Sequence, residues 1–183
     1  MSERKDDYMQ EDYSIKQSLQ NFSLKNLNTR IIAYLALFMA FTVIATFIRV
    51  PGVNTQYYNL GEVAIYTLAL VFGRKVGFIA GGIGSALADL MIAPIWAPIT
   101  LIVKGFEGWV VGSLAESGSF KRNIIALFLG AHIMIIGYFL AVWGLYDWPA
   151  AISEIIGNYG QALVGGIVAI PLSRQVNKYL GSD

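Results

Sequence analysis

Residues 31–48 read IIAYLALFMAFTVIATFI, an apolar run of 18 residues without a charged side chain. A helix needs roughly 20 such residues to cross the ~30 Å hydrocarbon core of a bilayer. The whole chain has the same bias, because 56% of its 183 residues are apolar and only 14% are charged, whereas soluble domains carry about 25% charged residues. The sequence therefore predicts an integral membrane protein. The absence of cysteine excludes disulfides and thiolate metal sites, and a net charge of +1 gives no sign of nucleic-acid binding.

Further apolar runs follow the first, each bounded by Gly, Pro or charge. The six runs are Ile31–Ile48, Leu60–Phe72, Val76–Ala93, Pro98–Ala115, Ile124–Tyr146 and Pro149–Leu172. The second run is too short to cross the membrane by itself. We expect its helix either to extend back through Tyr57–Asn59 or to lie where packing thins the membrane. Gly77, Gly81 and Ser85 stand four apart and predict a face that permits close helix packing. The predicted fold is an all-α integral membrane protein, a bundle of six transmembrane helices.

The distribution of Lys and Arg predicts how this bundle is oriented. With the N-terminus in the cytosol, eleven of these residues lie in inner segments and only Arg49 lies in an outer loop. Because cytoplasmic loops carry the excess of Lys and Arg, we expect both termini to be cytosolic. The predicted organisation is a polar cytosolic tail over residues 1–29, a six-helix membrane domain over 30–173 and a cytosolic tail over 174–183. The first tail is expected to be either disordered or an interfacial helix.

Ionisable side chains inside the apolar runs point to function, because each costs about 2.5–3.5 kcal/mol there. These residues are Glu62, Asp89, Lys104, Glu107, His132 and Glu154. Helical spacing puts Lys104 and Glu107 on one face, and puts Glu154, Asn158 and Gln161 on one face of another helix. All except His132, near the midplane, fall in the outer half. Two polar stripes at one depth predict a wet, outward-opening pocket, roofed by loops that contain Tyr58 and Trp96.

Other interpretations of these residues are open at this point. Lys104 and Glu107 could be a pair that neutralises itself, and the stripe on the sixth run could make hydrogen bonds between helices. His132 could be a packing histidine, and Glu62 and Asp89 could contact headgroups or water. The sequence contains no HExxH, GxSxG or GxxxxGK[ST] motif and no paired metal-ligand cluster. We therefore expect no catalysis, metal, cofactor or ATP hydrolysis in this chain.

Five short stretches carry a resemblance to a known family. They are NLGE at 59–62, FGRKVG at 72–77, GGIGSALAD at 81–89, PIWAP at 94–98 and KGFEG at 104–108. The chain resembles the substrate-binding S components of energy-coupling-factor (ECF) vitamin transporters, in the riboflavin-type branch, over residues 30–172. The resemblance implies six helices and a vitamin or precursor bound from outside. It also implies partnership with a transmembrane T subunit and two cytosolic ATPase subunits, which would supply the energy.

The resemblance implies roles for individual residues as well. Family members contact the T subunit through an Ala-x-x-x-Ala patch on the first helix, which Ala36 and Ala40 match. Thiamine-binding relatives place a carboxylate, a histidine and an asparagine in the last three spans, and Glu107, His132 and Asn158 are the matching candidates. The complete set of candidate ligand-binding residues is Tyr58, Asn59, Glu62, Asp89, Trp96, Lys104, Glu107, His132, Glu154, Asn158 and Gln161.

The predicted function is the high-affinity substrate-binding subunit of an ATP-driven importer in a prokaryotic plasma membrane, for a small water-soluble vitamin or precursor. The embedded charges are one Lys against four carboxylates, a net −3 if all ionise, which disfavours an anionic substrate. The candidate substrates are riboflavin, pyridoxine, hydroxymethylpyrimidine and thiamine-like compounds, and the sequence does not rank them. The alternative is a membrane-embedded enzyme acting on a lipid or isoprenoid, with Glu107 and His132 as a pair. A passive channel would need polar groups in both halves of the membrane, whereas the inner half of the predicted spans is nearly all apolar.

Overall fold

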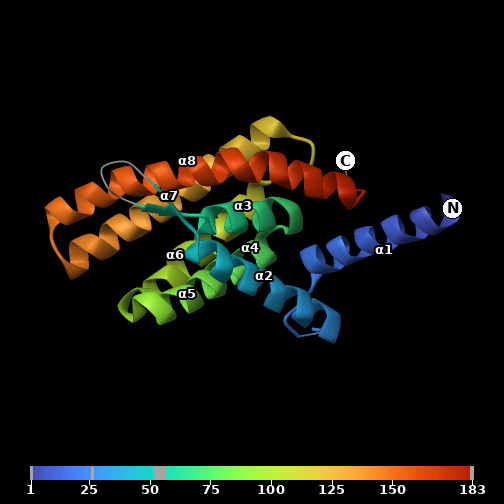
Figure 1. Cartoon of the computed structure of the whole chain (residues 1–183), viewed down its shortest axis with the longest axis horizontal. Helices are drawn as coiled ribbons and strands as arrows, with labels where there is room; N and C mark the ends of the chain where they lie inside the picture. The colour runs from blue at the N-terminus through green and yellow to red at the C-terminus, as the bar shows by residue number, and fades with distance from the viewer. Residues whose placement is uncertain (1, 26, 52–56, 182–183) are drawn as a thin grey trace.

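The computed structural model describes residues 2–25, 27–51 and 57–181, which form an elongated helical bundle with a short β-hairpin (Figure 1). The elements are α1 (Ser2–Asn21), α2 (Thr29–Phe47), β1 (Arg49–Pro51), β2 (Tyr57–Asn59), α3 (Gly61–Phe72), α4 (Arg74–Phe78), the π-helical segment η1 (Ile79–Ile83), α5 (Gly84–Ile92), the 3-10 turn η2 (Pro94–Trp96), α6 (Ala97–Leu114), α7 (Phe120–Leu145) and α8 (Trp148–Tyr179). The strands β1 and β2 pair antiparallel, with Val50 opposite Tyr58. The third apolar run, Val76–Ala93, is divided among α4, η1 and α5.

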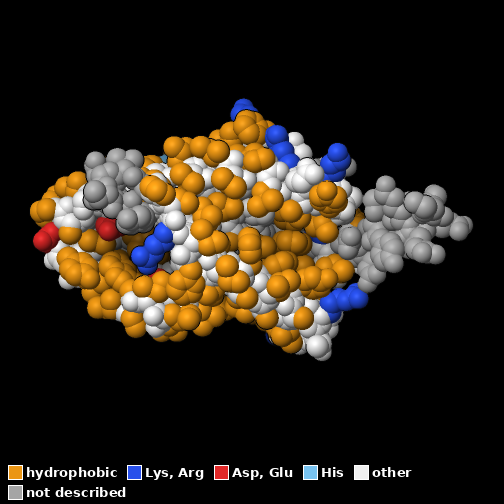
Figure 2. All heavy atoms as spheres, in the orientation of Figure 1, with side chains coloured by type: hydrophobic (Ala, Val, Ile, Leu, Met, Phe, Trp, Pro, Cys, Tyr) orange, Lys and Arg blue, Asp and Glu red, His pale blue; other side chains and the backbone are white. Residues whose placement is uncertain are grey.

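Five helical stretches in the described part of the chain are long and apolar enough to cross a membrane. They are Thr29–Phe47, Arg74–Ile92, Pro94–Leu114, Phe120–Leu145 and Trp148–Tyr179. Large apolar side chains project outward from them, with exposed fractions of 61% for Leu37, 60% for Phe128 and 65% for Leu163. Apolar side chains also cover most of the face drawn in Figure 2. An outer surface of this kind suits lipid rather than water, so the predicted all-α membrane architecture is confirmed at this level.

The remaining apolar helix, α3, is only 12 residues long and lies inside the bundle. Every residue from Gly61 to Val71 is buried. Ile65, Tyr66 and Leu70 belong to a core cluster with residues of α6, α7 and α8. The helix does not extend through Tyr57–Asn59, because these residues form β2. The short second run is therefore enclosed by protein instead of lipid.

Glycines allow the backbones of α4, η1 and α6 to touch. A Cβ atom on Gly77 would collide with the carbonyl of Gly108, and a Cβ on Gly108 would collide with the carbonyl of Gly77. In η1, a Cβ on Gly81 would lie 2.9 Å from the carbonyl oxygen of Lys104. Larger residues would push α6 away, so these glycines fix the position from which Lys104 projects.

The tail before the first apolar run contains helix α1, which packs against one end of the bundle. Leu19 and Phe22 are buried in a cluster with residues of α2, α3 and α4. Lys16 Nζ donates a 2.8 Å hydrogen bond to Asn177 Oδ1 of α8, and the ammonium of Lys75 donates to the Phe22 carbonyl. Figure 1 shows both termini at this end, with the hairpin and the α7–α8 turn at the other.

Candidate functional site

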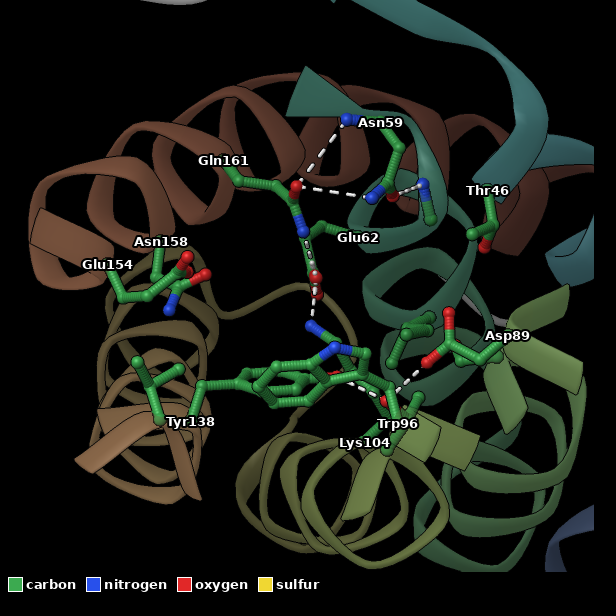
Figure 3. Close-up of a pocket in the computed structure, with 15 residues that line it drawn as sticks. Thr46, Asn59, Glu62, Asp89, Trp96, Lys104, Tyr138, Glu154, Asn158 and Gln161 are labelled. Atoms are coloured by element: carbon green, nitrogen blue, oxygen red, sulfur yellow. Dashed lines mark hydrogen bonds and ion pairs between the residues drawn. The ribbon is translucent and has the colours of Figure 1, made fainter. Parts of the chain in front are cut away.

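A cavity of about 300 Å³ lies at the end of the bundle where β2 joins α3. Its walls come from α2, β2, α3, α5, η2, α6, α7 and α8 (Figure 3). The lining residues are Thr46, Asn59, Gly61, Glu62, Ile65, Ser85, Asp89, Trp96, Thr100, Lys104, Tyr138, Val142, Glu154, Asn158 and Gln161. Acidic, amide, hydroxyl and aromatic groups thus converge on one space from helices far apart in the sequence.

The cavity floor contains a buried charge cluster centred on Lys104. Its ammonium contacts Glu62 Oε1 of α3 and lies 3.0 Å from Glu107 Oε2 of α6. The exposed fractions of the three side chains are 6%, 1% and 0%. Tyr66 donates a 2.7 Å hydrogen bond to the other oxygen of Glu107, so both Glu107 oxygens are occupied. The three formal charges sum to −1, and among the described residues the only side-chain oxygen of the cluster without a hydrogen-bond partner is Glu62 Oε2.

A chain of amide hydrogen bonds connects Glu62 to the hairpin. Gln161 Nε2 of α8 donates to Glu62 Oε1 at 2.9 Å, and Gln161 Oε1 accepts from Asn59 Nδ2 at 3.2 Å. Asn59 Oδ1 in turn accepts from the Gly61 backbone N–H at 2.9 Å. A Cβ on Gly61 would lie only 2.7 Å from this oxygen. These hydrogen bonds therefore hold the turn between β2 and α3 against α8 at the edge of the cavity.

The opposite wall is formed by a second hydrogen-bond chain and an aromatic group. Thr100 Oγ1 donates to Asp89 Oδ2 at 2.5 Å and lies 2.9 Å from Tyr138 Oη. Because the single hydroxyl proton of Thr100 goes to Asp89, Tyr138 is the donor in the second bond. The Trp96 ring lies 6.1 Å from the Tyr138 ring and stacks on Tyr146 at 6.2 Å. This side of the cavity offers a carboxylate and aromatic faces.

Two polar atoms in the cavity wall have no hydrogen-bond partner within the described residues. They are Glu62 Oε2, an acceptor, and Asn158 Nδ2, a donor, and both atoms are buried. A buried polar atom left unpaired costs about 1–3 kcal/mol, so native structures rarely leave one without a role. A ligand that donates to Glu62 and accepts from Asn158 would satisfy both atoms.

The structure brings most, but not all, of the candidate residues to this cavity. Asn59, Glu62, Asp89, Trp96, Lys104, Glu154, Asn158 and Gln161 line it. Tyr58 is buried with its ring against Gly160, and Glu107 lies behind Lys104. His132 points instead into a groove between α7 and α8, where its ring nitrogens lie 2.7 Å from the Phe128 carbonyl and 3.1 Å from Tyr159 Oη. The sequence predicts a depth for His132 near the midplane of the membrane, but the face of α7 that carries it turns away from the cavity.

Several lining residues did not appear among the sequence candidates. Thr46, Ser85, Thr100 and Tyr138 each add a hydroxyl group to the wall. Thr100 precedes Lys104 by four residues, and Ser85 precedes Asp89 by four, so helical periodicity could have placed both on the polar faces. Tyr138 gave no comparable signal, because it stands alone in a long apolar run.

Comparison with known proteins assigns the family. Residues 26–178 match the family model described as "ECF-type riboflavin transporter, S component". The chain belongs to this family. The predicted resemblance is therefore confirmed, and helix α1 precedes the matched region. The family is a component of a transporter rather than a family of enzymes, and this S component is the substrate-binding subunit of an ECF vitamin importer that associates with T and ATPase subunits in the membrane.

Relatives and a solved structure agree with the assignment. This S component is 36% identical over 144 residues to an uncharacterized protein of Pyrococcus woesei, a match that covers 78% of this chain and 97% of the relative. It is 28% identical over 160 residues to the thiamine precursor transporter HmpT of Lactococcus lactis subsp. cremoris (strain MG1363), covering 85% and 92%. Its fold is similar to a structure described as "Structure and mechanism of the S component of a bacterial ECF transporter", with a TM-score of 0.66, 18% identity, and coverage of 81% and 96%.

Proposed function

We propose that this S component binds a small amino-bearing heterocycle of the thiamine-precursor type, such as hydroxymethylpyrimidine, from the outer side of the plasma membrane. The observation that carries the proposal is that two lining residues from different helices, Glu62 of α3 and Asn158 of α8, each have a buried polar atom without a partner among the described residues. An aminopyrimidine edge presents an N–H donor beside a ring-nitrogen acceptor, which complements a carboxylate and an amide N–H. The name of the relative HmpT supports the same substrate class.

The size and charge of the cavity support a small, non-anionic substrate. Its volume of about 300 Å³ is at the lower end of the ~300–1,000 Å³ typical of ligand pockets, which favours a single ring over a fused three-ring system with a long polyol chain. Asp89 and Glu154 add carboxylates to a wall whose central cluster already sums to −1. An anionic ligand would be repelled there, whereas amino groups would be attracted. Trp96 supplies an aromatic face for the ring.

Riboflavin is the second candidate substrate, because the description of the family names it. Both ligands present hydrogen-bonding ring edges, but only the pyrimidine couples an exocyclic amine to a single small ring. Binding of riboflavin at least as tightly as hydroxymethylpyrimidine would reject the proposed substrate class while leaving the family assignment intact.

We also propose that the T subunit docks on α2 through Ala36 and Ala40. Both residues are exposed on this helix, and their small side chains would let a partner helix approach closely. The surface lies on a different helix from the unpartnered atoms of the cavity, so docking and ligand binding can be tested separately.

The binding proposal is tested by calorimetric titration of the detergent-purified protein with hydroxymethylpyrimidine, riboflavin and a pyrimidine that lacks the amino group. Asn158→Ala should weaken binding of the amino compound about 5- to 150-fold, the effect of losing one well-made hydrogen bond. Gln175→Ala removes an amide from the same helix outside the cavity and should leave affinity unchanged. Unchanged affinity in both Asn158→Ala and Glu62→Gln would show that the ligand binds elsewhere.

A further inference from the structure

A second cavity, of about 820 Å³, runs between α7 and α8. We call it the α7–α8 groove. Its walls are mainly apolar and include Leu127, Phe128, Leu163, Ile167 and Ile170. Phe128, Leu163 and Ile167 are 60%, 65% and 64% exposed, so the groove opens on the outer, lipid-facing surface of the bundle.

Small residues on α8 keep the groove open. Gly166 has no side chain, and a Cβ atom there would make only an ordinary 3.5 Å contact with Leu127 Cδ1. Close packing against a neighbouring backbone therefore does not require this glycine, unlike Gly165, whose Cβ would collide with Glu62 of α3. Pro171 also lies within α8 along the groove. The empty volume is available to an occupant that does not belong to the described chain.

The two ends of the groove differ in chemistry. Tyr159 and His132 mark one end, with a 3.1 Å contact between the Tyr159 hydroxyl and the His132 ring. Arg174 marks the other end, and its guanidinium lies 4.9 Å from the centre of the Phe120 ring. Within the part of the chain that the structure describes, no carboxylate forms an ion pair with Arg174. Among the residues that the structure describes, the groove is thus an apolar channel with a cation at one end that has no carboxylate partner.

The position of Arg174 along α8 matches the level of lipid headgroups. Arg174 follows Trp148, at the start of α8, by 26 residues, a rise of ~39 Å at 1.5 Å per residue. A bilayer measures about 40–45 Å between the outer limits of its headgroup regions. If Trp148 lies at one interface, Arg174 therefore lies at the other, and the apolar groove extends from it into the hydrocarbon core.

We propose that the α7–α8 groove binds an anionic phospholipid, with one acyl chain against Gly166 and the phosphate at Arg174. The apolar walls require an apolar occupant, and lipid tails surround this face of the molecule. An arginine without a carboxylate partner matches the phosphate of a headgroup, because its planar donors suit phosphate oxygens. A wholly apolar transmembrane helix of a protein partner would also fill the groove, but it would bring no counterion for Arg174.

The proposal is tested by native mass spectrometry of the detergent-purified full chain, titrated with phosphatidylglycerol or phosphatidylcholine of identical acyl chains. The protein should retain phosphatidylglycerol preferentially. Arg174→Gln should lower its apparent affinity about fivefold, the effect of one basic residue near an anionic headgroup. Gly166→Leu fills the groove and should reduce retention of both lipids.

Matched variants control for charge and bulk at other sites. Arg74→Gln removes a cation at the start of α4, and Gly144→Leu adds an apolar side chain where a Cβ meets nothing within 4 Å. Both should leave lipid retention unchanged, and thermal melting checks that every variant folds. Equal retention of the two lipids, or full retention of phosphatidylglycerol by Arg174→Gln, would overturn the proposal. Loss of T-subunit association in Gly166→Leu with unaltered lipid retention would assign the groove to a protein partner instead.

Discussion

Replacing Lys104 by methionine should strongly destabilise this S component, because the change leaves two buried carboxylates without their shared cation. The side chains of Glu62 and Glu107 are 1% and 0% exposed, and the Lys104 ammonium contacts both. Removing one member of a buried ion pair costs about 3–5 kcal/mol. For a chain of 183 residues, each kcal/mol lowers Tm by roughly 2–4 °C, so Lys104→Met should lower it by ~6–20 °C.

A matched triple variant separates the charge effect from lost packing. Glu62→Gln, Lys104→Met and Glu107→Gln together leave no charge in the cluster, and this protein should melt well above the single Lys104→Met variant. Glu107→Gln alone should cost less than Lys104→Met, because it retains the contact between Lys104 and Glu62 and leaves an acceptor for the Tyr66 hydroxyl. The measurement is thermal melting of the ligand-free proteins in one detergent. If the triple variant melts as low as Lys104→Met, uncompensated charge is not the cause of the loss and the reasoning is refuted.

Further predictions concern packing, topology and docking. Gly108→Ala should destabilise the protein by about 1–3 kcal/mol, because its Cβ would meet backbone of α4; Gly144→Ala, where nothing lies within 4 Å, should leave the melting temperature nearly unchanged. In this cysteine-free chain, a single cysteine at Asp147 should react with an impermeant thiol reagent in intact cells and one at Lys121 should not, and the reverse pattern would contradict the predicted orientation. Ala40→Trp should abolish uptake while leaving the ligand affinity of the isolated subunit intact, whereas loss of both would indicate a packing role.

The helices were largely predictable, because contact with lipid requires long apolar runs and close helix packing requires small residues at helical spacing. The first apolar run, Ile31–Ile48, corresponds to α2 at Thr29–Phe47. The second, Leu60–Phe72, corresponds to α3 at Gly61–Phe72. The four-residue spacing of Gly77, Gly81 and Ser85 indicated a tightly packed face, and Gly77 does meet α6 backbone. The π-helical segment η1 was not predictable, since a single wide turn hardly disturbs an apolar run.

Depth and spacing predicted that polar faces of two helices share one pocket, but not which side chains of different helices contact one another. Periodicity related Lys104 to Glu107, three residues apart, but it gave no sign that the same ammonium also contacts Glu62 of α3. Periodicity and depth also made His132 a candidate for the cavity, but the rotation of α7 directs this side chain into the α7–α8 groove. Tyr138, on another face of α7, reaches the cavity. Spacing defines a face of one helix, whereas the direction of that face depends on how neighbouring helices pack.

The shortness of α3 is the structural origin of the cavity. Its 12 residues span only ~18 Å at 1.5 Å per residue, which is ~12 Å less than the hydrocarbon core of a bilayer. Lipid cannot adapt to this mismatch, because protein surrounds the helix on all sides from Gly61 to Val71. The space left beyond the first turn of α3 is instead closed by β2 and bordered by α6 and α8. Glu62 stands in that first turn and lines the cavity, and its Oε2 has no hydrogen-bond partner among the described residues. A full-length second span would therefore cover the carboxylate on which we expect the ligand to bind.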